Sequence, residues 1–412
     1  MLSTSAPGGR TANARTMLGP AFVAASAYVD PGNFATGMAA GSAYGYRLLW
    51  VVCAAGAMAV LVQTVTAKLG MATGHGLAEL CRLHLPRLVR LVLWGLMEVV
   101  LVATELAEVV GGALALHLLV GVRLVVGGLI TGAVAIGVLA LETRGVRRFE
   151  SAVAGLLVLI AVALLYDLAG AGVSVDSLGA GLAPGFAGPE SLVLAAGIVG
   201  ATVMPHTLYL HSSLSAEHRR DLCPGAASRA ARRRMLRGTR VDTAVALSAA
   251  TLLNTVILLI AAQLLPGRVL QDLVGIHAAV AVRAGGASAL MFALALLASG
   301  LAASAVGTYT GQTVMSGFLR RSVPRPLRRA VTLVPALGVL AAGVDPTQAL
   351  VWSQVVLCFG VPFALLPLLW FSARRDVMAE LVNHPATTTV LALITLLITG
   401  LNALLLWGLL VP

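Results

Sequence analysis

Long apolar runs alternate with short polar segments along this chain. Runs of about 20 apolar residues match the thickness of a bilayer core. We predict helices at about 18–44, 47–71, 90–119, 122–142, 149–169, 190–216, 241–265, 287–319, 328–344, 347–373 and 386–411. Pro31 interrupts the first run and Pro205 the sixth. The pattern predicts an all-α integral membrane protein with about eleven transmembrane helices, of which helices 1 and 6 are broken.

Composition supports this class and excludes others. The chain is 58% hydrophobic and 11% charged, whereas soluble domains carry about 25% charged residues. The formal charge of +11 comes from arginines in the short segments between runs, and no basic stripe interleaved with aromatics indicates nucleic-acid binding. The expected surroundings are a lipid bilayer. The four cysteines (Cys53, Cys81, Cys223 and Cys358) are too far apart for a disulfide framework or a zinc site.

The placement of arginine predicts the orientation. With the N-terminus inside, only Arg47, Arg123, Arg268 and Arg283 fall in outer segments, as the positive-inside rule requires. The inner segments hold Arg82, Arg87, Arg90, Arg144, Arg147, Arg148, Arg219, Arg220, Arg229, Arg232, Arg233, Arg234, Arg237, Arg240, Arg320, Arg321, Arg325, Arg374 and Arg375. The polar start of the chain does not resemble a cleaved signal peptide. We expect a multi-pass protein of the cell (inner) membrane with a cytoplasmic N-terminus and an external C-terminus.

Corresponding interruptions in two halves of five helices indicate an inverted-repeat transporter with its site at the breaks. We expect repeat one at about 18–169, repeat two at about 190–373, and an additional helix at about 386–411. Proline cannot bond the carbonyl four residues earlier, so Pro31 frees that of Ala27 and Pro205 that of Ala201. Each freed carbonyl needs another partner in a bilayer. Gly32 is expected to help the first helix unwind.

The polar residues at the breaks predict a metal site. Asp30 and Asn33 offer hard oxygen ligands and Met204 a soft sulfur, a set that suits a divalent transition metal better than Mg²⁺ or Ca²⁺. His206 lies beside the second break and titrates near physiological pH. Two plainer interpretations remain open. Asp30 and Asn33 can simply cap a half-helix, and Met204 can be packing.

Three carboxylates, Glu98, Glu105 and Glu108, share one face of the third predicted helix. Carboxylates within a membrane usually mark an ion or proton route. Arg328 and Arg329, at the start of the ninth run, are natural partners. The alternative is that these ion pairs only fix the register of the helices.

The motifs at the breaks resemble a known family. Asp-Pro-Gly-Asn at 30–33 and Ala-Thr-Val-Met-Pro-His at 201–206 resemble the signature of the Nramp family of proton-coupled divalent metal transporters, especially the bacterial manganese transporters. Residues 297–300 with 307–312 resemble the transport motif of that family, and 353–354 with 359–363 its tenth helix. The family usually has Asn where this chain has Thr207, and Asp where it has Glu105.

The resemblance implies a LeuT-like fold of two inverted five-helix repeats, with the ion between helices one and six. It implies that Asp30, Asn33 and Met204 ligate through side chains and Ala201 through its carbonyl. The Ala27 carbonyl and Gln354 would join in other conformations. It also implies that salt bridges between the third and ninth helices carry protons inward.

Together these features predict a secondary active importer of Mn²⁺ (or Fe²⁺, Cd²⁺, Co²⁺), coupled to protons and working by alternating access. We expect a monomer that has no prosthetic group and is not an enzyme, since neither H-E-x-x-H nor G-x-S-x-G occurs. A Mg²⁺ transporter of the same fold and a Na⁺-coupled amino-acid symporter are the alternatives. Met204 argues against the first, and Asp30 would repel the carboxylate substrate of the second.

Overall fold

The structure, a computed structural model, describes residues 24–143, 146–172, 178–179, 181–222, 229–265, 272–321 and 323–410. Nearly all of this is helix. The elements are α2 (Pro31–Tyr44), η1 (Gly45–Leu48), α3 (Leu49–Thr73), α4 (Leu77–His84), α5 (Arg87–Val120), α6 (Leu124–Thr143), α7 (Val146–Ala171), α9 (Pro189–Val203), α10 (Pro205–Leu222), α11 (Arg229–Leu264), α12 (Leu273–Ala284), α13 (Gly286–Leu319), α14 (Arg325–Ala341), α15 (Pro346–Ser372), α16 (Arg375–Met378), η2 (Ala379–Leu381) and α17 (Pro385–Leu410).

Both predicted breaks are confirmed. Residues 24–26 are helical, the chain turns at 27–30, and α2 begins at Pro31. In the second half, Met204 alone separates α9 from α10, which begins at Pro205. The start of the first predicted run, at 18, lies outside the described residues. Each break falls where proline removes the hydrogen bond that would continue the preceding helix.

The predicted spans correspond to helices of the structure. Eight segments of the described chain are long and apolar enough to cross a membrane. One of them, Pro31–Thr73, contains two predicted spans, α2 and α3, while the apolar part of α6 is shorter, at Leu124–Val138. The ninth predicted span is the 17-residue α14. The short helices α4, α12 and α16 lie between spans and were not predicted.

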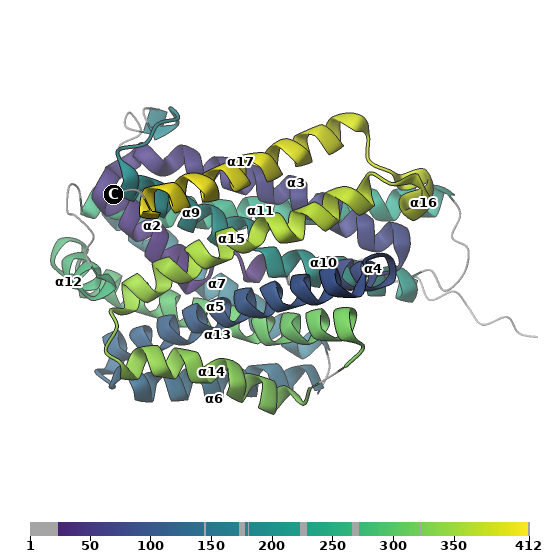
Figure 1. Cartoon of the computed structure of the whole chain (residues 1–412). Helices are drawn as coiled ribbons and strands as arrows, with labels where there is room; N and C mark the ends of the chain where they lie inside the picture. Colours follow the sequence, from purple (N-terminus) through teal and green to yellow (C-terminus); the bar gives the residue numbers. More distant parts are fainter. Residues whose placement is uncertain are drawn as a thin grey trace, which may run out of the picture.

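The helices run side by side, so their ends collect at two opposite ends of the molecule (Figure 1). One end carries α4 and α16, while α12 and the last residues of α17 lie at the other (Figure 1). We call the end with α4 and α16 the arginine-rich end, because Arg82, Arg219 and Arg374 belong to it. There the guanidinium groups of Arg219 and Arg220 donate to the carbonyls of Ala72 and Gly74, at the end of α3.

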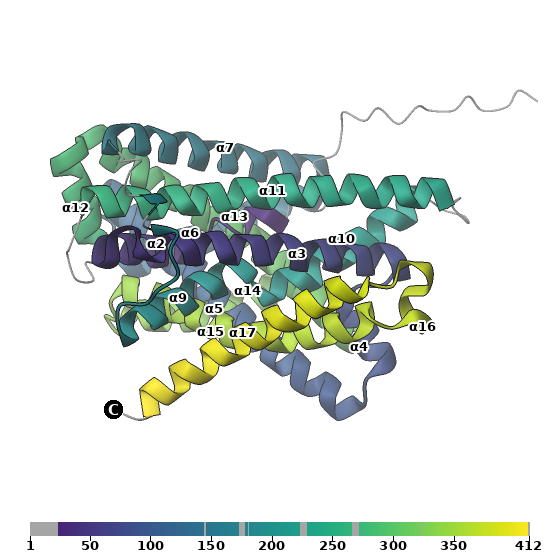
Figure 2. The same ribbon diagram turned by 90° about the horizontal axis from the view of Figure 1, so that it is seen from above.

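The helix contacts are equivalent in the two predicted halves: when each helix is replaced by its counterpart from the other half, the same pairs pack together. α2 packs on α11, and in the same way α9 and α10 pack on α3. α7 packs on α13, as α15 packs on α5. The pairs α5 with α13 and α6 with α14 each join equivalent helices of the two halves, and α6 and α14 lie together at one edge (Figure 1). α7 and α11 run along the opposite side from α17 (Figure 2). This exchange is what two related five-helix repeats require.

Small residues let the helices around the breaks approach closely, as is common in membrane bundles. A Cβ on Gly300 of α13 would lie 3.0 Å from the Glu108 carbonyl oxygen of α5. A Cβ on Gly200 of α9 would collide with the backbone of α15 at Gln354. Glycine therefore lets α13 pack closely on α5, and the interrupted α9 pack closely on α15.

The chain has a single lysine, Lys68 of α3. It is buried, and its ammonium donates to the Asn383 side chain in the segment between η2 and α17. Asn383 in turn donates to the Ser372 hydroxyl at the end of α15 (2.9 Å). Because a buried amine needs a partner, this chain of bonds ties α3 to α15 at the arginine-rich end.

Candidate metal-ion site

Asp30 closes the first break and has no exposed surface. Its Oδ1 accepts from the backbone N–H of Asn33 (2.8 Å), the bond of a helix N-cap, and also from Asn33 Nδ2 (2.8 Å). The capping interpretation is therefore part of the structure. It occupies one carboxylate oxygen and leaves Oδ2 facing Gln354, whose Nε2 lies 3.4 Å away.

The interrupted backbone is satisfied by side chains. Asn33 Nδ2 lies within hydrogen-bond distance of the carbonyls of Tyr28 (3.1 Å) and Ala201 (3.2 Å), so it joins the two breaks directly. Asn254 of α11 also donates to the Tyr28 carbonyl (2.9 Å), and Ser299 of α13 donates to that of Val29 (2.7 Å). Ala27 lies buried in the turn itself. Polar side chains thus take over the bonds that a continuous helix would make.

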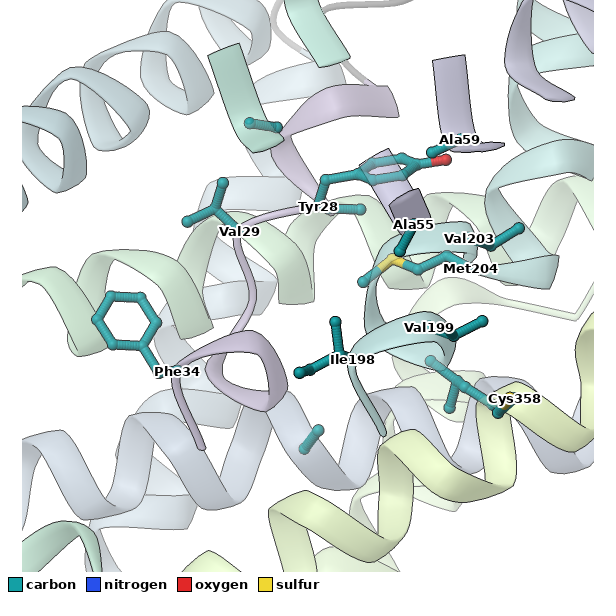
Figure 3. Packing of buried hydrophobic residues seen from close by; sticks show 14 of the residues in the cluster. Tyr28, Val29, Phe34, Ala55, Ala59, Ile198, Val199, Val203, Met204 and Cys358 are labelled. Atoms are coloured by element: carbon teal, nitrogen blue, oxygen red, sulfur yellow. The ribbon is translucent and has the colours of Figure 1, made fainter. Parts of the chain in front are cut away.

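Met204 forms the second break and is fully buried. Its carbonyl accepts from the Thr207 hydroxyl (2.8 Å). Figure 3 shows its thioether beside Ala55, in the region where Tyr28 and Val29 of the first break approach α9. A soft sulfur donor therefore lies at the second break, three residues after the Ala201 carbonyl that Asn33 contacts.

Gln354 of α15 completes the cluster. Its Nε2 is near Asp30 and Ser353 Oγ (3.2 Å), while its Oε1 is buried without a hydrogen-bond partner in the described structure. Gly32 makes room for it, since a Cβ at Gly32 would overlap the Gln354 side chain. Gly32 lies within regular α2, where it provides space for the Gln354 side chain. Its expected role in unwinding the first helix stays a prediction.

The donor chemistry at the breaks fits a dication. The cluster offers one carboxylate, amide oxygens, a carbonyl and a thioether, a mixed set suited to transition metals of intermediate softness. An unpaired buried acceptor such as Gln354 Oε1 is costly unless a cation or water meets it. Elsewhere in the described chain, no group of three or more His, Cys, Asp and Glu forms a conventional metal cluster.

A cavity of about 740 Å³ opens at the end opposite the arginines. Its wall includes the carboxylates of Glu190, Asp272 and Asp345. Val351 of α15 also lines it and precedes Gln354 by about one helical turn. An acidic cavity raises the local concentration of cations, so this cavity is suited to collecting metal ions close to the cluster.

The predicted carboxylate–arginine pairs are present between α5 and α14. Glu98 Oε2 lies 2.7 Å from Arg328 Nη2 and is partly exposed. Deeper in the bundle, Glu105 pairs with Arg329, and both are almost fully buried. Thr308 donates to Glu105 Oε1 (3.1 Å). The longer arm of Glu105 therefore still reaches an arginine on α14.

Glu108 lies between these pairs and the breaks. It is buried, and its Oε2 has no hydrogen-bond partner in the described structure. Gly111, one turn further along α5, faces the Pro31 ring so closely that no Cβ would fit. His206, in the first turn of α10, is buried with Nδ1 3.4 Å from the Thr104 hydroxyl, next to Glu105. Polar side chains therefore extend from the first break to Glu98.

A second polar network, not predicted from the sequence, lies beside the breaks. Gln63 Nε2 of α3 is within hydrogen-bond distance of the Tyr28 hydroxyl (2.6 Å) and the Thr207 hydroxyl (2.8 Å). Its Oε1 lies 2.8 Å from His211 Nδ1. All four side chains are buried. They join the first break to α3 and α10, which both continue to the arginine-rich end. The sequence feature that could have indicated this network is the polar Gln63 within an apolar run.

Comparison with known proteins decides the family. A sequence model of the natural resistance-associated macrophage protein-like family, Nramp, matches residues 21–408. The chain belongs to the Nramp family. It is also similar to the divalent metal cation transporter MntH of Deinococcus radiodurans, with 44% identity over 396 residues that cover 95% of this chain and 90% of the relative. This Nramp chain is a multi-pass membrane protein.

Solved structures agree with the architecture. The manganese transporter of Eremococcus coleocola, in complex with an aromatic bis-isothiourea compound, matches with a TM-score of 0.84 and 29% identity over 97% of this chain and 88% of that one. The nucleobase-cation-symport-1 family transporter Mhp1, in a closed conformation, matches with a TM-score of 0.61 and 19% identity over 88% and 80% of the two chains. The second likeness shows the fold alone, the LeuT-like arrangement that the resemblance to Nramp implied.

Proposed function

We propose that this Nramp chain imports Mn²⁺, and Fe²⁺, Cd²⁺ or Co²⁺ by the same ligands, across the cell (inner) membrane together with protons. The observation that carries the proposal is the buried contact between the two breaks, where Asn33 bridges Asp30 and the Ala201 carbonyl. The relatives named as divalent metal cation and manganese transporters support the substrate class. The ion is substrate, so no prosthetic group is needed.

In this proposal Asp30 supplies the charge that draws the dication from water. Asn33, the Ala201 carbonyl and Met204 complete the set of metal ligands. The Ala27 carbonyl and Gln354 become ligands in other conformations, as the helices move. Met204 disfavours Mg²⁺ and Ca²⁺, because thioether sulfur is a poor ligand for hard ions. Gln354 Oε1, which has no hydrogen-bond partner among the described residues, is an available oxygen ligand for the ion.

Protons would follow the carboxylates of α5 to the arginine-rich end. Glu108 lies near the first break and would exchange protons with His206 and Glu105, and Glu98 would release them. Arg328 and Arg329 hold the charged forms of Glu98 and Glu105 in place. Buried ionisable groups that line one helix face support a proton relay. A variant that neutralises both members of an ion pair distinguishes such a relay from a purely structural contact.

Alternating access would move the segment before Pro31 and α10 relative to the surrounding helices. The bonds of Gln63 with Tyr28, Thr207 and His211 would keep the path to the arginine-rich end closed, and their loss would open it. We further propose repeats at 18–169 and 190–373, a separate helix at 386–411, a cytoplasmic N-terminus, an external C-terminus and a monomeric state.

The decisive experiment compares Asp30→Asn with Asp30→Ala. Asparagine caps a helix as well as aspartate does, but it lacks the charge. If Asp30 serves the metal, both variants lose Mn²⁺ binding in calorimetric titration and Mn²⁺ uptake in proteoliposomes, while Asp30→Asn keeps the thermal stability of the parent. Normal uptake by Asp30→Asn would show that the carboxylate is only a cap and would overturn the proposal.

Met204→Ala tests selectivity and the alternative substrates. We expect Mn²⁺ uptake to weaken while Ca²⁺ and Mg²⁺ compete more strongly. Unchanged discrimination would remove the thioether from the selectivity mechanism. Titration of the parent chain with Mg²⁺ and with amino acids in Na⁺ buffer tests the two rival substrates, since saturable binding of either without Mn²⁺ binding would favour that rival.

A further inference from the structure

A second cavity, of about 680 Å³, opens at the arginine-rich end, away from the metal site. It lies where the end of α4, the start of α5 and the end of α13 meet. Its wall holds Trp94 and five arginines, namely Arg82, Arg87, Arg90, Arg320 and Arg321. Five cations converging on one cavity from three helix ends make a concentrated positive surface.

No acidic side chain of the described residues lines this cavity. The nearby carboxylates are used elsewhere, since Glu79 pairs with Arg220 and Glu98 pairs with Arg328. No ion pair between described residues joins any of the five arginines to a carboxylate. Arg90 Nε is buried and makes no hydrogen bond with any described residue, whereas Arg82 Nε donates to the Gly317 carbonyl (2.7 Å). The cavity therefore suits an anion that the described residues do not supply.

Electrostatic repulsion within the cluster leads to the same conclusion. Burial and then the nearby charge of Arg320 lower the pKa of Arg82, Glu79 acts in the opposite direction, and Arg90 lowers it further. The N-terminus of the 34-residue α5 adds the positive end of its helix dipole, and no side chain caps it. Guanidinium groups and free helix N–H groups are the usual donors to phosphate oxygens. An anion bound here would relieve the repulsion.

We propose that this cavity binds the phosphodiester headgroup of an anionic phospholipid. It lies at the ends of membrane-crossing helices, the depth at which headgroups are found. Trp94 lines it, an aromatic side chain typical of the membrane interface. The cavity wall itself also holds apolar side chains, including Leu83 and Leu91, against which acyl chains can pack. A soluble anion would use the arginines but would gain nothing from this apolar surface.

The test uses the full chain in nanodiscs of phosphatidylcholine, into which phosphatidylglycerol is titrated and the retained lipid is counted by native mass spectrometry. One variant is the pair Arg87→Gln with Arg90→Gln. The other is Arg320→Asn, chosen because Arg320 has φ 56° and asparagine tolerates that conformation. Arg375→Gln is the matched control. It removes the same charge from an exposed residue at the same end, outside the cavity.

We expect the parent and Arg375→Gln to retain phosphatidylglycerol in preference to phosphatidylcholine. Each cavity arginine removed should weaken retention by about fivefold. Equal retention of both lipids by the parent would overturn the proposal. The proposal would also be overturned if Arg87→Gln with Arg90→Gln retained as much phosphatidylglycerol as Arg375→Gln, while both variants had the melting temperature of the parent. Displacement of phosphatidylglycerol by millimolar inorganic phosphate, with the same dependence on arginine, would assign the cavity to free phosphate instead.

Discussion

The buried pair of Glu105 and Arg329 allows the strongest test of the proton route. The two side chains are 4% and 2% exposed. Removing one charge of such a pair leaves the other uncompensated, at a cost of about 3–5 kcal/mol. Glu105→Gln keeps the size of the side chain and its bond with Thr308, but not its charge. We therefore expect a clearly lower melting temperature in detergent for this variant.

The double variant Glu105→Gln with Arg329→Gln removes both charges at once. Replacing a buried ion pair by neutral residues is often neutral or even stabilising, so the double variant should recover most of the lost stability. A single variant as stable as the parent would contradict the reasoning from burial, because it would mean that Arg329 needs no counter-charge.

Transport then separates the two roles of the pair. In proteoliposomes that contain a pH-sensitive dye, Mn²⁺ uptake by the parent should acidify the lumen. If Glu105 carries protons, the double variant is stable but its Mn²⁺ uptake brings little acidification. Normal acidification by the double variant would refute the relay and leave the pair as a structural contact that fixes α5 against α14.

Two further predictions follow from contacts at the breaks. Gly32→Ala should lower the free energy of unfolding by about 1–3 kcal/mol through overpacking and weaken Mn²⁺ binding, because the new Cβ overlaps Gln354. Adding Gln354→Ala should restore the stability, measured by melting curves, but not the affinity, measured by calorimetry. Tyr28→Phe removes a hydroxyl bonded to Gln63 and near Thr207, worth about 1 kcal/mol, so opening toward the arginine-rich end should become about fivefold more favourable. Faster thiol labelling of a cysteine placed at Ala24, in a chain without its own cysteines, would report this, and an unchanged rate would contradict a closing role for the network.

The sequence was sufficient to predict the broken helices, because proline in an apolar run has few structural solutions. It also predicted that Glu98 and Glu105 face α14, since helical periodicity and the position of Arg328 and Arg329 determine it. Both are local patterns, set within one or two helices. The resemblance to Nramp then supplied Gln354, which no local pattern identifies.

The long-range bonds of the site could not be predicted in the same way. Asn254 and Ser299 reach the carbonyls of Tyr28 and Val29 from helices more than 200 residues further along the chain. A single polar residue in an apolar run indicates that the side chain has a hydrogen-bond partner, but it does not identify that partner. The space that Gly32 leaves could not be predicted for the same reason, since the need for it comes from Gln354 on another helix.

The single lysine gives the protein a built-in chemical reporter. Amine-reactive reagents have only Lys68 and a terminal α-amino group to attack, and Lys68 is shielded while Asn383 holds it between α3 and α15. If the helices separate at the arginine-rich end during the transport cycle, the acylation rate of Lys68 should rise. The acylation rate of this one natural residue, measured by mass spectrometry, would then report opening at that end without an engineered cysteine.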